Sequence, residues 1–299
     1  MNHQSINMGY QLLDGQIAAK AWHHEIFEGV QQMVAAGHAP PHLSVLRIGE
    51  DPASRLYVRN KERSARSIGF SFNEVSLPAD ADQGHVENVI DELNHNDAVD
   101  AYILQLPIPS HLDLERLILT MSPDKDADGF HPVNLGKLFR EHPDAILPAT
   151  PQGILRLLRH YNVAVEGRHC VVVGRSLIVG KPMAMLLQRK HGMPANATVT
   201  LVHSRSRDAK QLIRQGDVVI VAIGNPHWLS GEMIKAGAVV IDVGIHRVAS
   251  PRGYQWVGDV DFASVAPRTQ AITPVPGGVG PMTVASLLWN VFTIARRRR

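Results

Sequence analysis

The sequence predicts an α/β protein of two domains, because helical and strand-like segments alternate along its 299 residues. In the first half, amphipathic helical patterns alternate with short strands. In the second half, short and almost wholly apolar runs recur at residues 170–173, 218–223 and 239–243. Such runs are typical of parallel strands covered on both faces, so we expect a Rossmann-like, doubly wound parallel sheet there.

The first half begins with an expected helix over residues 14–36, in which Ile26, Val30 and Met33 recur at helical spacing and Gly37 ends the pattern. The segments that follow are a strand over 43–48, a helix over 53–67, a strand over 70–77, a helix around 86–93 and a strand over 101–104. Thr150-Pro151 resembles an N-cap followed by proline at the first helical position, which places a domain boundary nearby.

In the second half, helices separate the apolar runs. We expect them over residues 181–188, 208–214 and 231–236, with a further strand over 198–202. The last helix carries Val284, Leu287 and Val291 at helical spacing and is expected to pack back on the first domain. The expected domains are therefore residues 1–148, completed by residues 283–299, and a nucleotide-binding domain over residues 149–282.

Composition excludes several classes of protein. Hydrophobic residues make up 44% and charged residues 19%, and the net charge is only +2, so neither a disordered chain nor a nucleic-acid binder is expected. The one basic cluster, residues 296–299, indicates either an anionic partner or, as we favour, a solvated helix end. Sixteen scattered histidines without a zinc-type spacing predict no bound metal.

Location follows from what the chain lacks. Cys170 is the single cysteine, so no intrachain disulfide forms, which fits a reducing compartment. No signal-peptide pattern opens the sequence, and no apolar run reaches the roughly 18 residues needed to span a membrane. We therefore expect a cytoplasmic protein with no membrane partner.

A glycine turn follows the apolar run at residues 170–173. Glycine at Gly174 and Gly180 permits close approach to phosphates at a helix N-terminus, although the same pattern occurs in ordinary strand-to-helix turns. The next strand ends in His203-Ser204-Arg205, without the acid that commonly binds the ribose of NAD. The side chains suited instead to a 2′-phosphate, and hence to NADP, are Arg175, Ser176, Ser204 and Arg205.

Three features of the first half carry candidate chemistry. Tyr57 and Lys61 are four residues apart, so they share a helix face from which a ring and an amine project. Gln105 ends an apolar strand, where side chains line the ligand edge of a parallel sheet. Asp128 lies in an Asp-Ala-Asp-Gly run that binds a donor pair or simply forms a turn. Taken singly, Tyr57 and Lys61 are more typical of a solvated helix face and Asp128 of a turn, whereas Gln105 is equally a polar residue that leaves the sheet.

A loop at residues 273–283 contains three prolines and three glycines and then opens a helix. Such a loop is stiff yet approaches a ligand along its backbone, so we prefer a binding loop to an interdomain linker.

Together and in this order, six motifs resemble the bifunctional methylenetetrahydrofolate dehydrogenase/methenyltetrahydrofolate cyclohydrolase family, called FolD in bacteria. The resemblance runs nearly end to end. The motifs are Tyr-x-x-x-Lys at 57–61, Leu-Gln-Leu-Pro at 104–107, Lys-Asp-Ala-Asp-Gly at 125–129, Pro-Ala-Thr-Pro at 148–151, Val-Val-Gly-Arg-Ser…Val-Gly-Lys-Pro at 172–182, and Pro-Val-Pro-Gly-Gly-Val-Gly-Pro-Met-Thr at 274–283.

The resemblance implies an enzyme of one-carbon metabolism. It would oxidise 5,10-methylenetetrahydrofolate with NADP⁺ and hydrolyse the methenyl product to 10-formyltetrahydrofolate. It implies two α/β domains with a cleft between them, and usually a homodimer. The alternatives are a nicotinamide-dependent dehydrogenase of shikimate or hydroxy-acid type, a family member without the hydrolase step, and a non-catalytic folate- or nucleotide-binding protein.

The resemblance also implies roles for individual residues. Tyr57 would stack on the pterin, and Lys61 would be the catalytic amine, oriented by Gln105. Asp128 would anchor the amino-pyrimidine edge. The other expected substrate-lining residues are Leu104, Leu106, Pro276, Gly277, Gly278, Val279 and Gly280. The expected nucleotide-binding residues are Gly174, Arg175, Ser176, Ser204 and Ile245. Ala149 and Arg63 depart from the family pattern, and residues 1–9 are expected to be a flexible lead.

Overall fold

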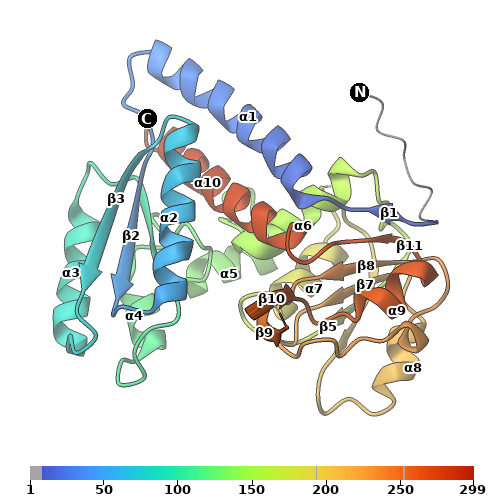
Figure 1. Ribbon diagram of the computed structural model, residues 1–299. Coiled ribbons are helices and arrows are strands. Elements are labelled where there is room, and N and C mark those ends of the chain that lie inside the picture. The colour runs from blue at the N-terminus through green and yellow to red at the C-terminus, as the bar shows by residue number, and fades with distance from the viewer. Residues whose placement is uncertain (1–8, 193, 252) are drawn as a thin grey trace. The chain divides into compact units, whose positions relative to one another are not determined.

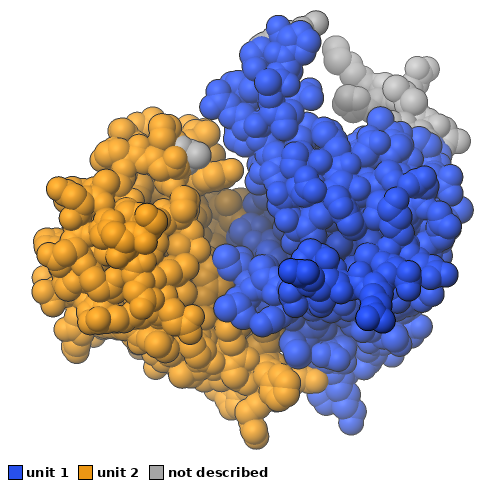
Figure 2. Space-filling view, turned by 90° about the horizontal axis from the view of Figure 1, so that it is seen from below, with its two compact units in different colours: residues 1–19, 150–283 blue, residues 20–149, 284–299 orange. Residues whose placement is uncertain are grey.

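The computed structural model describes residues 9–192, 194–251 and 253–299 (Figure 1). Residues 1–8 of the expected lead lie outside this part. The described chain forms two compact units, which Figure 2 colours separately. Unit 1 comprises Met1–Ala19 and Thr150–Thr283, and unit 2 comprises Lys20–Ala149 and Val284–Arg299. The domain limits expected from the sequence stay a proposal.

Unit 2 contains a parallel sheet of three strands among the residues described, in the order β3-β2-β4. Because β2 is central and the chain adds β3 on one side and β4 on the other, the winding reverses between β2 and β4. Apolar side chains of α3 and α4 pack on the sheet through Val86, Ile90 and Leu117. The elements of this unit are β2 (His42–Ile48), α2 (Pro52–Ser67), β3 (Ser71–Leu77), α3 (Gln83–His95), β4 (Ala101–Leu104), α4 (Leu114–Thr120) and α5 (Pro132–Phe139), with most of α1 (Gly15–Ala35) and α10 (Val279–Arg297).

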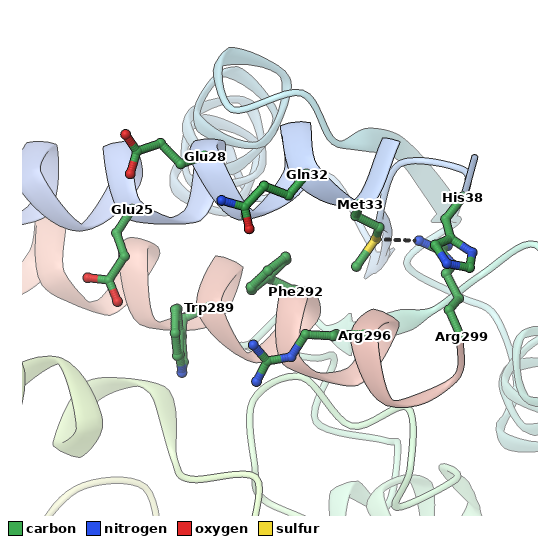
Figure 3. A pocket seen from close by; sticks show the side chains of 10 residues that line it. Glu25, Glu28, Gln32, Met33, His38, Trp289, Phe292, Arg296 and Arg299 are labelled. Atoms are coloured by element: carbon green, nitrogen blue, oxygen red, sulfur yellow. Dashed lines mark hydrogen bonds between the residues drawn. The ribbon is translucent and has the colours of Figure 1, made fainter. Parts of the chain in front are cut away.

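Helices α1 and α10 pack against each other within unit 2. The ring centroids of Trp22 and Trp289 are 6.0 Å apart. A Cβ at Gly29 would lie 2.5 Å from the Phe292 ring, so only glycine allows this close approach. A groove lies beside this contact, and Figure 3 shows side chains of both helices along it. Most of the last helix therefore belongs to the same compact unit as β2, β3 and β4.

Two of the C-terminal arginines, although exposed, form hydrogen bonds within unit 2. Arg298 Nη1 donates to the carbonyl oxygen of Val99 at 2.7 Å. Arg299 Nη2 donates to the buried carboxylate of Asp100 at 2.8 Å, and Figure 3 shows the same guanidinium against the sulfur of Met33. Both residues are nevertheless exposed beyond the end of α10, as a solvated helix end would be. Their anionic partners lie within the chain.

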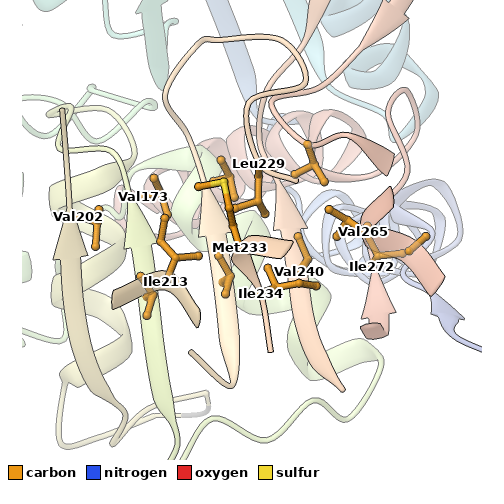
Figure 4. Close-up of a cluster of buried hydrophobic side chains, with 14 residues drawn as sticks. Val173, Val202, Ile213, Leu229, Met233, Ile234, Val240, Val265 and Ile272 are labelled. Atoms are coloured by element: carbon orange, nitrogen blue, oxygen red, sulfur yellow. The ribbon is translucent and has the colours of Figure 1, made fainter. Parts of the chain in front are cut away.

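Unit 1 is built on a parallel sheet with six strands among the described residues, in the order β1-β11-β8-β7-β5-β6. Valine and isoleucine side chains from neighbouring strands form a buried cluster, shown in Figure 4. Cys170 is fully buried in this sheet, and burial raises its thiol pKa to about 12, which suits a core residue and not a nucleophile. The strands are β1 (Gln11–Leu12), β5 (His169–Val173), β6 (Thr198–Val202), β7 (Val218–Val221), β8 (Ala238–Asp242) and β11 (Thr269–Ile272).

The sheet of unit 1 is covered by short helices and carries an antiparallel hairpin that we did not anticipate. The hairpin pairs β9 with β10. The remaining elements are α6 (Ala149–His160), α7 (Gly180–Gln188), α8 (Ala209–Arg214), η1 (Gly231–Met233), β9 (His246–Ser250), β10 (Gly253–Val257), α9 (Phe262–Val265) and η2 (Ala266–Arg268).

Two local expectations are wrong. The helix expected over residues 231–236 is a single 3₁₀ turn, because Met233 and Ile234 fill the core and Ile234 is already extended. Thr150 is not the N-cap of α6, which begins one residue earlier. The Thr150 hydroxyl instead lies 3.1 Å from that of Thr283. Helices α4 and α5 were not anticipated, although His131 and Pro132 provide a cap and a proline at the first turn of α5.

Candidate functional site

Helix α2 positions the first candidate pair. The Asp51 carboxylate accepts from the Ser54 amide at 2.7 Å and caps the helix, and Pro52 occupies its first turn. The helix then continues to Ser67, which places Tyr57 and Lys61 one turn apart. The Lys61 Nζ donates to Gln105 Oε1 at 2.7 Å. The structure thus brings together two residues that are 44 positions apart.

Gln105 is held at the carboxyl end of β4. Its amide N–H donates to the Leu46 carbonyl at 2.8 Å and prolongs the pairing with β2. Its Nε2 donates to the Leu106 carbonyl at 2.6 Å. Because a carbonyl only accepts, this bond turns Oε1 of the buried side chain toward the lysine. Gln105 is therefore a fixed acceptor for the amine of Lys61.

The two carboxylates of the segment at residues 125–129 have different roles. Asp126 is buried and accepts from the amides of Gly129 at 2.9 Å and His131 at 2.8 Å, and from Asn134 Nδ2 at 3.0 Å. Backbone bonds also tie this segment to β4. Asp126 therefore shapes the turn that presents Asp128.

Burial disfavours the charged forms of both Lys61 and Asp128. Burial lowers the pKa of Lys61 from its ordinary value, and the negative charge of Asp128 partly opposes this shift. Burial raises the pKa of Asp128 to about 6. The positive charge of Lys61 opposes that increase, and Asp126 adds to it. The pair therefore combines an amine that loses its proton readily with a carboxylate that keeps its proton to a higher pH than usual.

A mostly apolar hollow lies beside Asp128. Leu104, Leu106 and Asp128 line one small hollow, together with Phe130. The side chain of Tyr57 is 40% exposed on α2, so its ring offers a face to a ligand. Unit 2 thus provides a ring, an amine, an amide and a carboxylate from α2, the end of β4 and the turn after it.

The glycine turn of unit 1 depends on two glycines. Gly174 follows β5 with φ +124°, and a Cβ there would lie 2.2 Å from the Ala222 carbonyl oxygen, which follows β7. A Cβ at Gly180 would lie 2.2 Å from the Gly174 oxygen. The Ser176 hydroxyl accepts from the amides of Val179 at 3.1 Å and Gly180 at 3.3 Å. Ser176 therefore shapes the turn, whatever else it contacts.

The other nucleotide candidates lie at the same edge of the sheet of unit 1. Arg175 and Ser204 are exposed, just after β5 and β6. Ile245 is 46% exposed in the loop after β8. All three follow the carboxyl ends of parallel strands, where open α/β sheets bind ligands.

The proline- and glycine-rich loop leads from β11 into α10. Gly277 has φ +105°, and its carbonyl accepts from the Gly15 amide at 2.8 Å. Pro276 and Gly280 are exposed, whereas Gly278 and Val279 are buried. A lining role therefore suits the exposed members of the loop better than the buried ones.

Comparison with known proteins shows which family this chain resembles. Residues 148–299 match the family model "Tetrahydrofolate dehydrogenase/cyclohydrolase, NAD(P)-binding domain", and residues 13–128 match the catalytic domain of the same family. A protein from Flavobacterium johnsoniae named bifunctional protein FolD is 46% identical over 97% of this chain and 98% of its own length. A FolD crystal structure from Campylobacter jejuni superposes with a TM-score of 0.91 at 38% identity, covering 97% of this chain and 100% of the other. The Trypanosoma brucei enzyme, complexed with NADP cofactor and inhibitor, gives 0.90 at 40% identity, covering 97% and 98%.

The chain belongs to the tetrahydrofolate dehydrogenase/cyclohydrolase family. It is therefore a bifunctional FolD-type enzyme of one-carbon folate metabolism, with an α/β catalytic domain and a parallel-sheet NAD(P)-binding domain. This confirms the expected fold class and activity and decides against a shikimate- or hydroxy-acid dehydrogenase. The roles of individual residues stay predictions.

Other FolD residues of interest were not found from the sequence. Asp242 and Asp259 are buried acids at the carboxyl edge of the sheet of unit 1. Asp259 stands in Val257-Gly258-Asp259-Val260-Asp261, where a second acid follows two residues later. The sequence therefore contained no signal that Asp259, rather than Asp261, is the buried carboxylate.

The described residues of this FolD-type chain include neither a metal-holding cluster nor a membrane-spanning helix. In the part of the chain that the structure describes, no three or more histidine, cysteine, aspartate or glutamate side chains are grouped to hold a metal ion. Within the same ranges, every helix is too short or too polar to cross a membrane.

Proposed function

We propose that this enzyme oxidises 5,10-methylenetetrahydrofolate with NADP⁺ and hydrolyses the resulting methenyl cation to 10-formyltetrahydrofolate, with Lys61 as the proton-transfer group of the hydrolysis. The observation that carries this assignment is the 2.7 Å bond from Lys61 to Gln105 in a buried setting. A neutral partner orients the amine without stabilising its charge, whereas a carboxylate in the same place would lock it as an ammonium.

The dehydrogenase step needs positioning more than acid or base chemistry. When bound, NADP⁺ supplies the hydride acceptor. The turn at Gly174 brings backbone N–H groups to the phosphates, and the N-terminus of α7 favours their charge. The chain's contribution to this step is therefore the alignment of the donor carbon with the acceptor ring.

The hydrolysis step requires a base. Water adds to the methenyl carbon and loses a proton, and the carbon–N5 bond then breaks as N5 takes up a proton and the new hydroxyl releases its own to solvent, which leaves the 10-formyl product. One proton is released overall. Neutral Lys61 accepts the proton of the attacking water and returns one to N5. Its lowered pKa makes the neutral amine available nearer to physiological pH, and a cationic substrate lowers it further.

Tyr57 and Asp128 are proposed to hold the pterin. The exposed ring of Tyr57 stacks on the flat heterocycle. The ionised carboxylate of Asp128 accepts two N–H bonds from the amino-pyrimidine edge, a geometry that matches its paired oxygens. The exposed residues Pro276 and Gly280 are proposed to line the substrate as well.

We propose NADP rather than NAD as the preferred nucleotide. The segment after β6 reads His203-Ser204-Arg205, so no carboxylate meets the ribose there. Arg175 and Ser204 are exposed at that edge and suit a 2′-phosphate. The Trypanosoma brucei relative, whose structure holds NADP, supports the same preference.

Two further expectations stay predictions. The enzyme is proposed to be a homodimer, which light scattering of the purified protein tests. A cytoplasmic location rests on the single cysteine and the sequence pattern, and cell fractionation tests it.

One experiment tests the proposed reactions directly. Purified protein is mixed with 5,10-methylenetetrahydrofolate and NADP⁺, and methenyl and formyl products are followed together with NADPH. We expect NADPH and 10-formyltetrahydrofolate to form in equal amounts after a brief methenyl phase. Accumulation of methenyltetrahydrofolate at its uncatalysed rate of hydrolysis would contradict the second activity.

A further inference from the structure

A buried aspartate ties together two loops at the nucleotide edge of unit 1. Asp259 is fully buried in the segment after β10. Its carboxylate accepts from three successive amides after β7, those of Ile223 at 2.8 Å, Gly224 at 3.1 Å and Asn225 at 2.8 Å. Three N–H groups that would otherwise point away from the strand are thereby turned to one acceptor.

The same carboxylate binds a histidine at the first position of β9. His246 Nε2 lies 2.7 Å from Asp259 Oδ1 and donates to it, and the histidine side chain is 21% exposed. His246 follows Ile245 directly and begins β9, at the end of the loop that follows β8. Asp259 thus connects the loop after β7 with the end of the loop after β8, and β7 and β8 are neighbouring parallel strands.

A second aspartate, Asp242, holds the backbone around Asp259 in place. Asp242 ends β8 and accepts from the amides of Gly244, Asp259 and Val260 at 2.9 to 3.0 Å. The packing leaves no space for a side chain at Gly244, since a Cβ there would lie 2.4 Å from the backbone nitrogen of Asp259. A Cβ at Gly258 would lie 1.8 Å from Asp242 Oδ2. The position of the Asp259 carboxylate is therefore set by its own backbone.

We propose that Asp259 and His246 are positioning residues that hold the loops at 222–225 and 243–245 in the shape that binds the nucleotide. This inference rests on the proposed role of Ile245 at the nucleotide site. Charge-assisted bonds from three amides and an imidazole fix both loops before the ligand arrives, so binding need not order them. Loss of the bond from His246 frees the backbone on either side of Ile245, whose side chain then no longer has a fixed place.

The test compares His246→Ala with His246→Gln, because glutamine keeps an N–H donor and alanine does not. Dehydrogenase KM for NADP⁺ and kcat are measured, together with nucleotide-free hydrolysis of methenyltetrahydrofolate. We expect His246→Ala to raise KM for NADP⁺ about tenfold with hydrolysis unchanged. His246→Gln should restore KM to within about threefold of the parent. His160→Ala, at an exposed histidine of α6, is the matched control and should change nothing.

Three outcomes would overturn the proposal. They are an unchanged KM in His246→Ala, no rescue by His246→Gln, and an equal fall of hydrolysis and dehydrogenase activity, which indicates a general structural role. Asp259→Asn serves as a second variant. The asparagine keeps one acceptor oxygen, but its NH₂ group would face the N–H donors that the carboxylate now accepts from. A larger rise in KM for NADP⁺ than in His246→Ala is therefore expected. Failure of the parent enzyme to reduce NADP⁺ would instead refute the proposed function.

Discussion

The candidate pterin site of unit 2 and the nucleotide edge of unit 1 depend on different kinds of chemical groups. The first depends on ionisable side chains taken out of water, Lys61 and Asp128, with pKa values shifted toward each other. The second depends on backbone shape, through Gly174 and buried aspartate caps, with exposed side chains such as Arg175 added at the rim. Proton transfer requires a group whose charge changes easily, whereas hydride transfer requires only placement. The two sites should therefore fail in different ways.

Removal of the amine should have the largest effect. Lys61→Met keeps the length of the side chain and is expected to lower cyclohydrolase turnover about 10³-fold, because proton transfer by a positioned group contributes on that order. Dehydrogenase activity should fall much less, since hydride transfer needs no base. Formation of 10-formyltetrahydrofolate from the methenyl substrate measures the first effect, and NADPH formation measures the second.

Arg63→Met is the matched control for this comparison, because Arg63 is an exposed cation on the same helix. It should leave both activities within about twofold, as exposed charges contribute little. Full hydrolysis by Lys61→Met with a normal circular dichroism spectrum would remove Lys61 from the mechanism.

A change at the glycine turn should have the converse effect. Gly174→Ala puts a Cβ 2.2 Å from a carbonyl oxygen at φ +124°, so the turn must move. A shift of about 1 Å at a positioning element costs on the order of 100-fold, which we expect in dehydrogenase kcat/KM. Nucleotide-free hydrolysis should stay within about threefold of the parent, since no proton moves at this turn. Equal losses in both assays would show that the two sites are not separable in this way.

The fold was predictable where a pattern is local. Apolar runs such as residues 170–173 predicted the parallel strands, and helical spacing predicted α1 and α10. Residues 231–236 show where this reasoning fails, because Met233 and Ile234 enter the core from a turn and mimic the apolar spacing of a helix. Tertiary packing decides such segments, and no window of sequence contains it.

The site was predictable only in part, for a similar reason. The spacing of Tyr57 and Lys61 is local and could be read from the sequence, but the bond between Lys61 and Gln105 joins residues 44 apart. The two aspartates of residues 125–129 look alike in sequence. Only the hydrogen bonds show that Asp126 forms the turn while Asp128 is presented by it. The residue types of the site could be predicted from the sequence, whereas the role of each residue depends on contacts that only the structure shows.

The partly buried carboxylate of Asp128 should have opposite effects on stability and on activity. Asp128→Asn is expected to lower both activities about 30-fold, since it loses charge-assisted bonds to the pterin. The same change should stabilise the fold by about 1–2 kcal/mol above pH 6, because it removes a charge that burial disfavours.

The sign of this stability effect follows from the pKa. Burial raises the pKa of Asp128 in the folded state from 3.8 to about 6. The ionised carboxylate therefore costs stability above pH 6, and the cost disappears as pH falls toward 4. Thermal unfolding of the parent and of Asp128→Asn from pH 4 to 8 measures the difference, which should shrink as pH falls. A variant less stable than the parent at pH 8 would contradict the proposed cost.

The rim of the nucleotide edge should give the smallest effect and the most selective one. Arg175 is exposed, so its attraction for a phosphate is screened by water and salt. Arg175→Ala is expected to weaken NADP⁺ about tenfold and NAD⁺ less than twofold, because only NADP⁺ carries the 2′-phosphate. The KM values for NADP⁺ and NAD⁺ measure this difference between the two nucleotides. Raising the ionic strength should reduce the preference of the parent enzyme for NADP⁺. Lys190→Ala, at an exposed cation beyond the end of α7, controls for a general loss of positive charge. An equal loss for both nucleotides would place Arg175 away from the 2′-phosphate, and the specificity would then have to come from the segment around Ser204.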